Sequence, residues 1–286
     1  MIRLCAFADE SGESLDTQIA ALHRNGITLV ELRSVNGKNV ADLTDEEASS
    51  CQKTLEENGI AVWSVGSPLG KVKLSEAAEH MEKVRRVCRI AQLLKTDKIR
   101  MFSFFESYGD PAAVKQYLSE MTAIAKEYGV CLYHENEKEV YGDTLARVVE
   151  LTEAGIKGLR FVFDPANFLQ CGERVREALD TLFDKIDYLH IKDVIVETGE
   201  LVPAGHGDGA IDYILDRIAA SGRDTVLTLE PHLKVFSGYG SIDNTVLQTK
   251  FSFASNEESF DAAANALKAV LSSCGYKETE KGAFAK

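Results

Sequence analysis

Four consecutive short apolar runs between residues 130 and 230 each end in a side chain that can hold a metal ion or move a proton. The four side chains are Glu135, Asp164, His190 and Glu230. Carboxylates are costly to bury unless they are paired or bind a cation, so a cluster of them requires a positive charge nearby. Three carboxylates and one imidazole suit one divalent ion (Mn²⁺, Mg²⁺, Co²⁺ or Zn²⁺) with coordination positions left for a substrate.

Each of these residues also has a purely structural explanation. Glu135 or Glu230 alone could be a solvated acid at the end of a strand, and Asp164 before Pro165 is an ordinary turn opener and helix cap. His190 could be a core histidine whose ring nitrogens are satisfied by neighbours. The occurrence of all four at the ends of four successive apolar runs favours a shared metal site over four separate structural roles.

The runs that end in these residues belong to a series of eight. Predicted strands cover residues 3–7, 28–32, 61–65, 98–102, 130–135, 159–164, 186–192 and 225–230. Amphipathic stretches with apolar residues three and four positions apart separate them, which is the pattern of a parallel sheet with helical crossovers. Eight strand–helix units are the number that closes a (β/α)₈ TIM barrel, and such a barrel carries its active site at the carboxyl ends of its strands.

An open, doubly wound sheet is the alternative architecture. The glycine-rich dinucleotide loop that follows the first strand of such a sheet is missing here, because residues 8–12 read ADESG. We therefore expect a single domain, with the barrel over residues 1–274 and a charged, frayed tail at 275–286. The irregular stretch 233–259 carries several aromatic residues and is predicted to be a lid, with Phe236 or Tyr239 covering the substrate.

Composition and charge restrict the partners. The 286 residues include 45 acidic and 32 basic ones, and the net charge of −13 disfavours binding to nucleic acid or to anionic membranes. The six cysteines form no CxxC pair, which is typical of reduced intracellular thiols rather than of disulfides. No signal-peptide core follows the N-terminus, and no apolar stretch approaches the roughly 18 residues of a membrane span. We expect a cytoplasmic protein that acts on a small molecule.

Five short motifs resemble the xylose isomerase-like TIM-barrel superfamily, which includes sugar phosphate isomerases and epimerases. They lie at residues 132–136 (LYHEN), 163–167 (FDPAN), 189–193 (LHIKD), 203–207 (PAGHG) and 229–232 (LEPH). The resemblance implies that the four residues above are the ligands of one divalent metal, and that Glu135 and Glu230 also form the acid/base pair of an enediolate mechanism. It further implies a carbohydrate substrate, and members of the superfamily often form homo-oligomers. The candidate substrate-binding residues beside the motifs are Asn167, Lys192, Glu137, His232 and His206.

Two positions depart from the superfamily pattern and leave the reaction open. Asn167 and Glu137 each stand where many members have a histidine. Residues 194–202 contain no arginine or lysine, although several epimerases hold their substrate with an arginine there, which weakens the case for a phosphorylated substrate.

Three functions are compatible with such a site. Isomerisation or epimerisation of a sugar or sugar derivative is the leading prediction, and dehydration or C–O elimination on an inosose or keto-sugar is the alternative. A non-catalytic sugar-binding barrel is a further alternative. An endonuclease IV-like repair enzyme is disfavoured by the net charge and by Gly199 and Leu201, which stand where extra zinc ligands would be needed.

Overall fold

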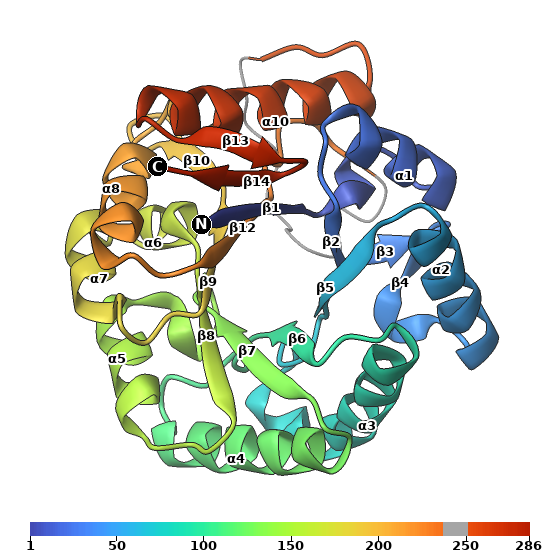
Figure 1. Cartoon of the computed structure of the whole chain (residues 1–286). Helices are drawn as coiled ribbons and strands as arrows, with labels where there is room; N and C mark the ends of the chain where they lie inside the picture. Colours follow the sequence, from blue (N-terminus) through green and yellow to red (C-terminus); the bar gives the residue numbers. More distant parts are fainter. Residues whose placement is uncertain (237–250) are drawn as a thin grey trace.

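Eight parallel strands close into a barrel because the first of them pairs with the last (Figure 1). The structure is a computed structural model that describes residues 1–236 and 251–286. The barrel strands are β1 (Ile2–Ala6), β2 (Leu29–Leu32), β5 (Ala61–Gly66), β6 (Lys98–Met101), β7 (Cys131–Glu135), β8 (Leu159–Phe163), β9 (Tyr188–Ile191) and β12 (Thr225–Leu229). The predicted TIM barrel is confirmed, and each predicted strand is present within a few residues of its expected ends.

Helices surround the barrel and bury their apolar sides against it (Figure 1). They are α1 (Leu15–Arg24), α2 (Asp45–Glu57), α3 (Ala77–Leu93), α4 (Pro111–Glu127), α5 (Leu145–Glu153), α6 (Pro165–Gln170), α7 (Val175–Leu182), α8 (Ile211–Ser221) and α10 (Asn256–Ser273). Local sequence explains where several of them begin. Thr44 and Glu47 form a capping box at α2, and the carboxylate of Asp110, before Pro111, accepts a hydrogen bond from the amide of Ala113 in the first turn of α4.

Two small hairpins extend the barrel at the carboxyl ends of its strands. β3 (Ser34–Val35) and β4 (Lys38–Asn39) follow β2, while β10 (Asp193–Ile195) and β11 (Glu200–Val202) follow β9. A short helical turn, η1 (Ala8–Glu10), follows β1. These segments bring further polar side chains to the same end of the barrel as the predicted metal ligands.

The expectation of a frayed C-terminal tail is wrong. Residues 277–285 form a hairpin of β13 (Lys277–Glu280) and β14 (Ala283–Ala285), and β14 pairs antiparallel with β1. β1 pairs with β2 only over Cys5 and Ala6, so the first residues of β1 need another partner on that side. β14 supplies it, and the ring of Phe284 is buried in the core.

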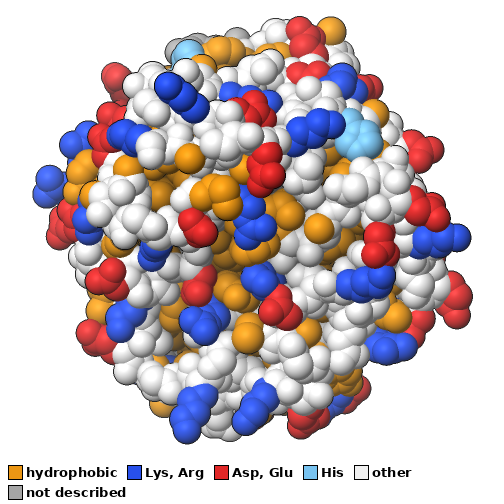
Figure 2. Space-filling model, viewed as in Figure 1, with side chains coloured by type: hydrophobic (Ala, Val, Ile, Leu, Met, Phe, Trp, Pro, Cys, Tyr) orange, Lys and Arg blue, Asp and Glu red, His pale blue; other side chains and the backbone are white. Residues whose placement is uncertain are grey.

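Other expectations from the sequence are tested only in part. All six cysteines are free. Within the described ranges, no helix combines the length and the apolar character that a membrane span requires. Acidic and basic side chains alternate over the face shown in Figure 2. The expected lid includes residues 237–250, and with them Tyr239, which lie outside the described residues; Phe236 is described, and its ring lies against the guanidinium of Arg33.

Candidate metal centre and active site

The four predicted ligands meet at one end of the barrel. Glu135 ends β7, Asp164 follows β8, His190 lies in β9 and Glu230 follows β12, and these strands deliver them to the carboxyl-end rim. All four side chains are buried, and one possible ligand atom of each lies within 4.8 Å of the others. The backbone at Asp164 is fixed locally, because Asp164 caps α6 by accepting the amide of Asn167 at 2.9 Å.

An imidazole stands at the centre of this cluster. Nδ1 of His190 lies 2.8 Å from Oε1 of Glu135 and 3.1 Å from Oε2 of Glu230. Its other ring nitrogen, Nε2, lies 3.2 Å from Oε2 of Glu31, at the end of β2. One ring nitrogen therefore faces the predicted ligands while a carboxylate holds the other, which is the usual setting of a metal-binding histidine.

The residues present fit a divalent metal ion. Among the described residues, Oδ2 of Asp164 and Oε2 of Glu230 are buried without a hydrogen-bond partner. Oδ2 of Asp164 lies 3.1 Å from Nζ of Lys192, and Oε2 of Glu230 lies 3.1 Å from Nδ1 of His190. Neither contact has hydrogen-bond geometry. Buried carboxylate oxygens of this kind normally have partners, and a cation bound between them would supply one.

Burial and neighbouring charges shift the acid–base properties of the cluster in opposite directions. Burial raises the pKa of Asp164 to about 7, although the nearby Lys192 ammonium opposes the shift. Burial alone would lower the pKa of His190, but the carboxylates of Glu135, Glu31 and Glu230 together outweigh it and the pKa rises well above its ordinary value. Burial alone would raise the pKa of Glu230, but Lys192 and His190 hold it well below its ordinary range. Without a metal, the negative charge of the buried carboxylates is thus compensated by bound protons and by the ammonium group of Lys192.

Each of the two candidate acid/base glutamates has its own arginine. Nη1 of Arg33 donates to Oε1 of Glu230 at 2.9 Å, and the same guanidinium binds both oxygens of Asp9. Nε of Arg100 lies 3.2 Å from Oε2 of Glu135. In both glutamates one oxygen faces His190 and the other faces an arginine, so each carboxylate is held in a fixed orientation at the rim.

Four of the five predicted substrate-binding residues join this site. Asn167, Lys192, Glu137 and His232 are buried at the same end of the barrel. The side-chain amide nitrogen of Asn167, Nδ2, donates to the backbone carbonyl of Asn136 at 2.9 Å and lies 3.4 Å from Oε1 of Glu135. The prediction for His206 stays untested: the side chain is exposed, and its described ring contact is with Phe251.

The sequence assigned no role to the residues that support the ligands, although the resemblance to the superfamily includes Glu31 at the end of the second predicted strand. Glu31 holds His190 and in turn accepts hydrogen bonds from the hydroxyls of Tyr188 (3.0 Å) and Thr228 (3.1 Å). Arg33 and Arg100 hold the glutamates. The one available signal was the pair Glu31 and Arg33, two positions apart at the end of an apolar run, where both side chains lie on one face of the strand.

A family model described as xylose isomerase-like TIM barrel matches residues 19–268. The chain belongs to this family. Solved structures of similar fold include a D-psicose 3-epimerase determined in the presence of D-fructose, with a TM-score of 0.76 and 18% identity over 96% of this chain and 99% of that one. An L-ribulose 3-epimerase gives a TM-score of 0.74 and 18% identity, with 96% of each chain covered. A probable 3-DHS dehydratase of petrobactin synthesis from Bacillus anthracis gives 0.70 and 17%, over 94% of this chain and 99% of that chain.

These identities are low, so the three structures share the fold of the xylose isomerase-like barrel with this chain and say nothing more about it. No curated protein matches the sequence. The resemblance inferred from the five motifs is confirmed at the level of the family. The assignment of the reaction rests on the site itself.

Proposed function

We propose that the protein is a divalent-metal-dependent isomerase or epimerase of a sugar or sugar derivative, and that its reaction passes through an enediolate of the substrate. One observation carries the proposal: three carboxylates and one imidazole, all buried, offer ligand atoms within 4.8 Å of one another at the rim of a xylose isomerase-like barrel. The sugar 3-epimerases of similar fold agree with it.

Glu135, Asp164, His190 and Glu230 would hold the ion. A bound divalent ion polarises two neighbouring substrate oxygens and makes the carbon–hydrogen bond beside them acidic. Asn167, with its amide at the rim, and Lys192 are placed to orient hydroxyl groups of the substrate.

Proton transfer falls to the two glutamates. Glu135 ends β7 and Glu230 follows β12, so they approach the substrate position from different strands of the rim. One carboxylate takes the proton from carbon, and the other returns it to the opposite face of that carbon or to its neighbour. Oε2 of Glu135 and Oε1 of Glu230, which do not face His190, are the atoms that carry the proton. Arg100 and Arg33 keep these oxygens in place.

Dehydration of an inosose or keto-sugar is the second candidate. It would begin with the same proton removal and end with loss of a hydroxyl group from the next carbon. Lys192 is placed for it, because its buried ammonium, 3.1 Å from Asp164, can donate a hydrogen bond to a departing hydroxyl. The two reactions give different products, and NMR separates them.

Metal content and deuterium incorporation test the proposal together. Protein purified without chelator should contain about one divalent ion per chain, and with Mn²⁺ it should exchange solvent deuterium into the carbon beside the carbonyl of at least one ketose in D₂O. Asp164→Ala should abolish metal binding. Asp110→Ala is the matched control, because it removes an equivalent Asp–Pro helix cap at α4 and leaves the cluster untouched.

Three ions per chain, or unchanged metal content in Asp164→Ala, would contradict the proposed site. One ion per chain with no deuterium exchange and no turnover across ketoses, inososes and oxidised sugars would identify a binding barrel rather than an enzyme.

A further inference from the structure

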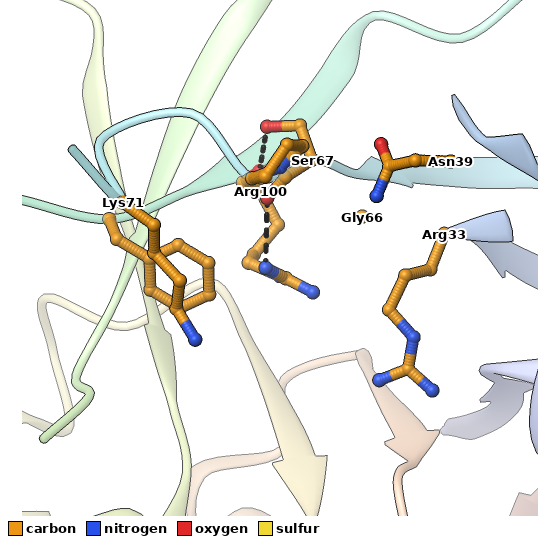
Figure 3. A pocket seen from close by; sticks show the side chains of 8 residues that line it. Arg33, Asn39, Gly66, Ser67, Lys71 and Arg100 are labelled. Carbon is orange, nitrogen blue, oxygen red and sulfur yellow. Dashed lines mark hydrogen bonds between the residues drawn. The ribbon is translucent and has the colours of Figure 1, made fainter. Parts of the chain in front are cut away.

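A small cavity opens beside the metal cluster, between the carboxyl ends of β2, β5 and β6 (Figure 3). The empty space between its walls, including the part that is open to solvent at its mouth, is about 270 Å³. Three cationic side chains line it, together with polar and small residues: Arg33, Lys71, Arg100, Asn39, Ser67 and Gly66. No acidic residue is among the lining residues that the structure describes. The charged groups that line this cavity are therefore all cationic, and the carboxylates that pair with them, on Glu230, Glu135 and Glu137, are not among its lining residues.

Arg100 is held firmly but makes few hydrogen bonds. Its side chain is only 4% exposed, and its guanidinium lies 4.5 Å from the ring centre of Phe102 and 5.3 Å from that of Phe7. Nη1 donates to the carbonyl of Ser67 at 3.0 Å, while Nε has no hydrogen-bond partner among the described residues. A guanidinium has five N–H donors, so Arg100 retains capacity for another acceptor.

Lys71 completes the cationic wall. Its Nζ lies 4.4 Å from the ring centre of Phe102 and 2.9 Å from Oε2 of Glu137. Figure 3 shows the amino group of Lys71 and the guanidinium groups of Arg100 and Arg33 on the same side of Ser67 and Gly66.

Gly66 keeps the cavity open. A Cβ atom at this position would lie 2.5 Å from the ring of Phe7 and 3.4 Å from Nη2 of Arg100. Any other residue would displace the aromatic ring or the guanidinium. Glycine at the last position of β5 therefore leaves the space that the ring of Phe7 and the guanidinium of Arg100 occupy.

The cavity adjoins the proposed acid/base glutamates, because residues that line it contact both of them. Arg33 contacts Glu230 at 2.9 Å and Arg100 contacts Glu135 at 3.2 Å, so two of the three cations that line the cavity touch the acid/base pair. A substrate held between the two glutamates would reach the cavity with a substituent on its carbon chain.

We propose that this cavity is a subsite for an anionic substituent, a carboxylate or a phosphate, on the sugar-derived substrate. The inference rests on the proposed function and specifies its substrate class. A desolvated charged donor such as Nε of Arg100 forms a stronger hydrogen bond to an anionic oxygen than to a neutral hydroxyl, so an anionic substituent fits this cavity better than a hydroxymethyl group. Residues 194–202 lack a cation, and the cations instead come from the residue after β2, from β6 and from the segment after β5.

Three matched ketoses test the subsite by calorimetry on Mn²⁺-loaded protein. D-fructose, D-fructuronate and D-fructose 6-phosphate differ only in a hydroxymethyl, carboxylate or phosphate group at the end of the chain. We expect one of the two anionic forms to bind about ten- to hundredfold more tightly than D-fructose. The form that binds more tightly identifies the anion.

Lys71→Met should reduce that preference about tenfold or more. Lys73→Met is the matched control: it removes the same charge two residues away, from a side chain that is 52% exposed and paired with Glu106, and it should leave the preference unchanged. If wild-type protein binds D-fructose as tightly as both anions, or binds none of the three, the subsite is refuted. Equal losses in the two lysine variants refute it as well. Metal content in the same samples tests the proposed function separately. One ion per chain without a preference for the anionic ketoses would refute the subsite and leave the proposed metal site standing.

Discussion

Replacing Glu230 by glutamine separates proton transfer from metal binding and folding. Glutamine keeps the shape of the side chain and one oxygen that can bind a cation, but it cannot take up a proton near neutral pH. In the structure, Oε2 of Glu230 faces His190 and Oε1 accepts from Arg33. The substitution therefore removes the charge and the basicity at one point of the cluster while leaving its packing in place.

The effect on stability should be moderate. Arg33 keeps two hydrogen bonds to Asp9, of 2.9 and 3.0 Å, and its contact with Glu10 at 3.2 Å. The charge of Arg33 is therefore not left unpaired. The free energy of unfolding should fall by about 1.5–3 kcal/mol, the contribution of one charge-assisted hydrogen bond, rather than by the roughly 3–5 kcal/mol that an unpaired buried charge costs. Domains with about 5–15 kcal/mol of stability remain folded after such a loss.

The effect on turnover should be much larger. A positioned acid/base group contributes about 10²–10⁴-fold to a rate, or about 3–5 kcal/mol of barrier. The measurement is deuterium incorporation by NMR in D₂O with Mn²⁺-loaded protein, beside metal content and circular dichroism of the same sample. Asp143→Asn serves as the control, because it neutralises a carboxylate paired with Arg147 at 2.7 Å, away from the cluster. If Glu230→Gln exchanges deuterium within a few-fold of wild type, catalysis by the glutamate pair is refuted.

Three further outcomes are expected. Glu31→Gln should weaken metal binding about 10–100-fold in competition with a chelator, because His190 loses the carboxylate at 3.2 Å from its Nε2; unchanged affinity would deny Glu31 that role. Phe284→Ala should destabilise the protein by about 3–5 kcal/mol in urea unfolding, since the ring is only 4% exposed, and a loss below about 1 kcal/mol would show the tail hairpin to be dispensable. Burial raises the pKa of Glu10 from 4.5 to about 8. The native state then binds a proton that the unfolded state has released, so the stability of metal-free protein should fall as pH rises through this window, and Glu10→Gln should flatten that fall.

The barrel and its ligands could be predicted because both depend on short-range patterns. Eight apolar runs separated by amphipathic stretches specify strands and helices, and the carboxyl-end rule then places the residues that end each run at one rim. Glu135, Asp164, His190 and Glu230 all end or follow such runs, and the structure brings them together. No knowledge of side-chain direction was needed for that step.

The supporting residues could not be predicted because they depend on direction and register. β2 pairs with β5 through a register shift between Val30 and Glu31, so alternation along the strand does not show that Glu31 points toward His190. Arg100 lies within a predicted strand with no motif beside it. Its role follows only from the distance to Glu135.

The tail hairpin escaped prediction for a different reason. Every residue of β13 is exposed and the segment reads as a solvated, charged stretch. Only the short run 283–285 beyond Gly282 carries apolar side chains. Pairing with β1 decides its structure, and local propensity does not report a partner at the other end of the chain.

The pairing of β1 also has consequences for the order in which the protein folds. β1, which is synthesised before the other barrel strands, pairs along its whole length only with β12, at residues 225–229, and with β2 over two residues. Contacts so distant in sequence form only after a large loss of chain entropy, which makes closure of the barrel a late and slow event. Until then the edges of β1 and β12 present unpaired backbone groups, which can pair with other chains. The seam between these two strands is therefore where a partly synthesised chain is most exposed to aggregation.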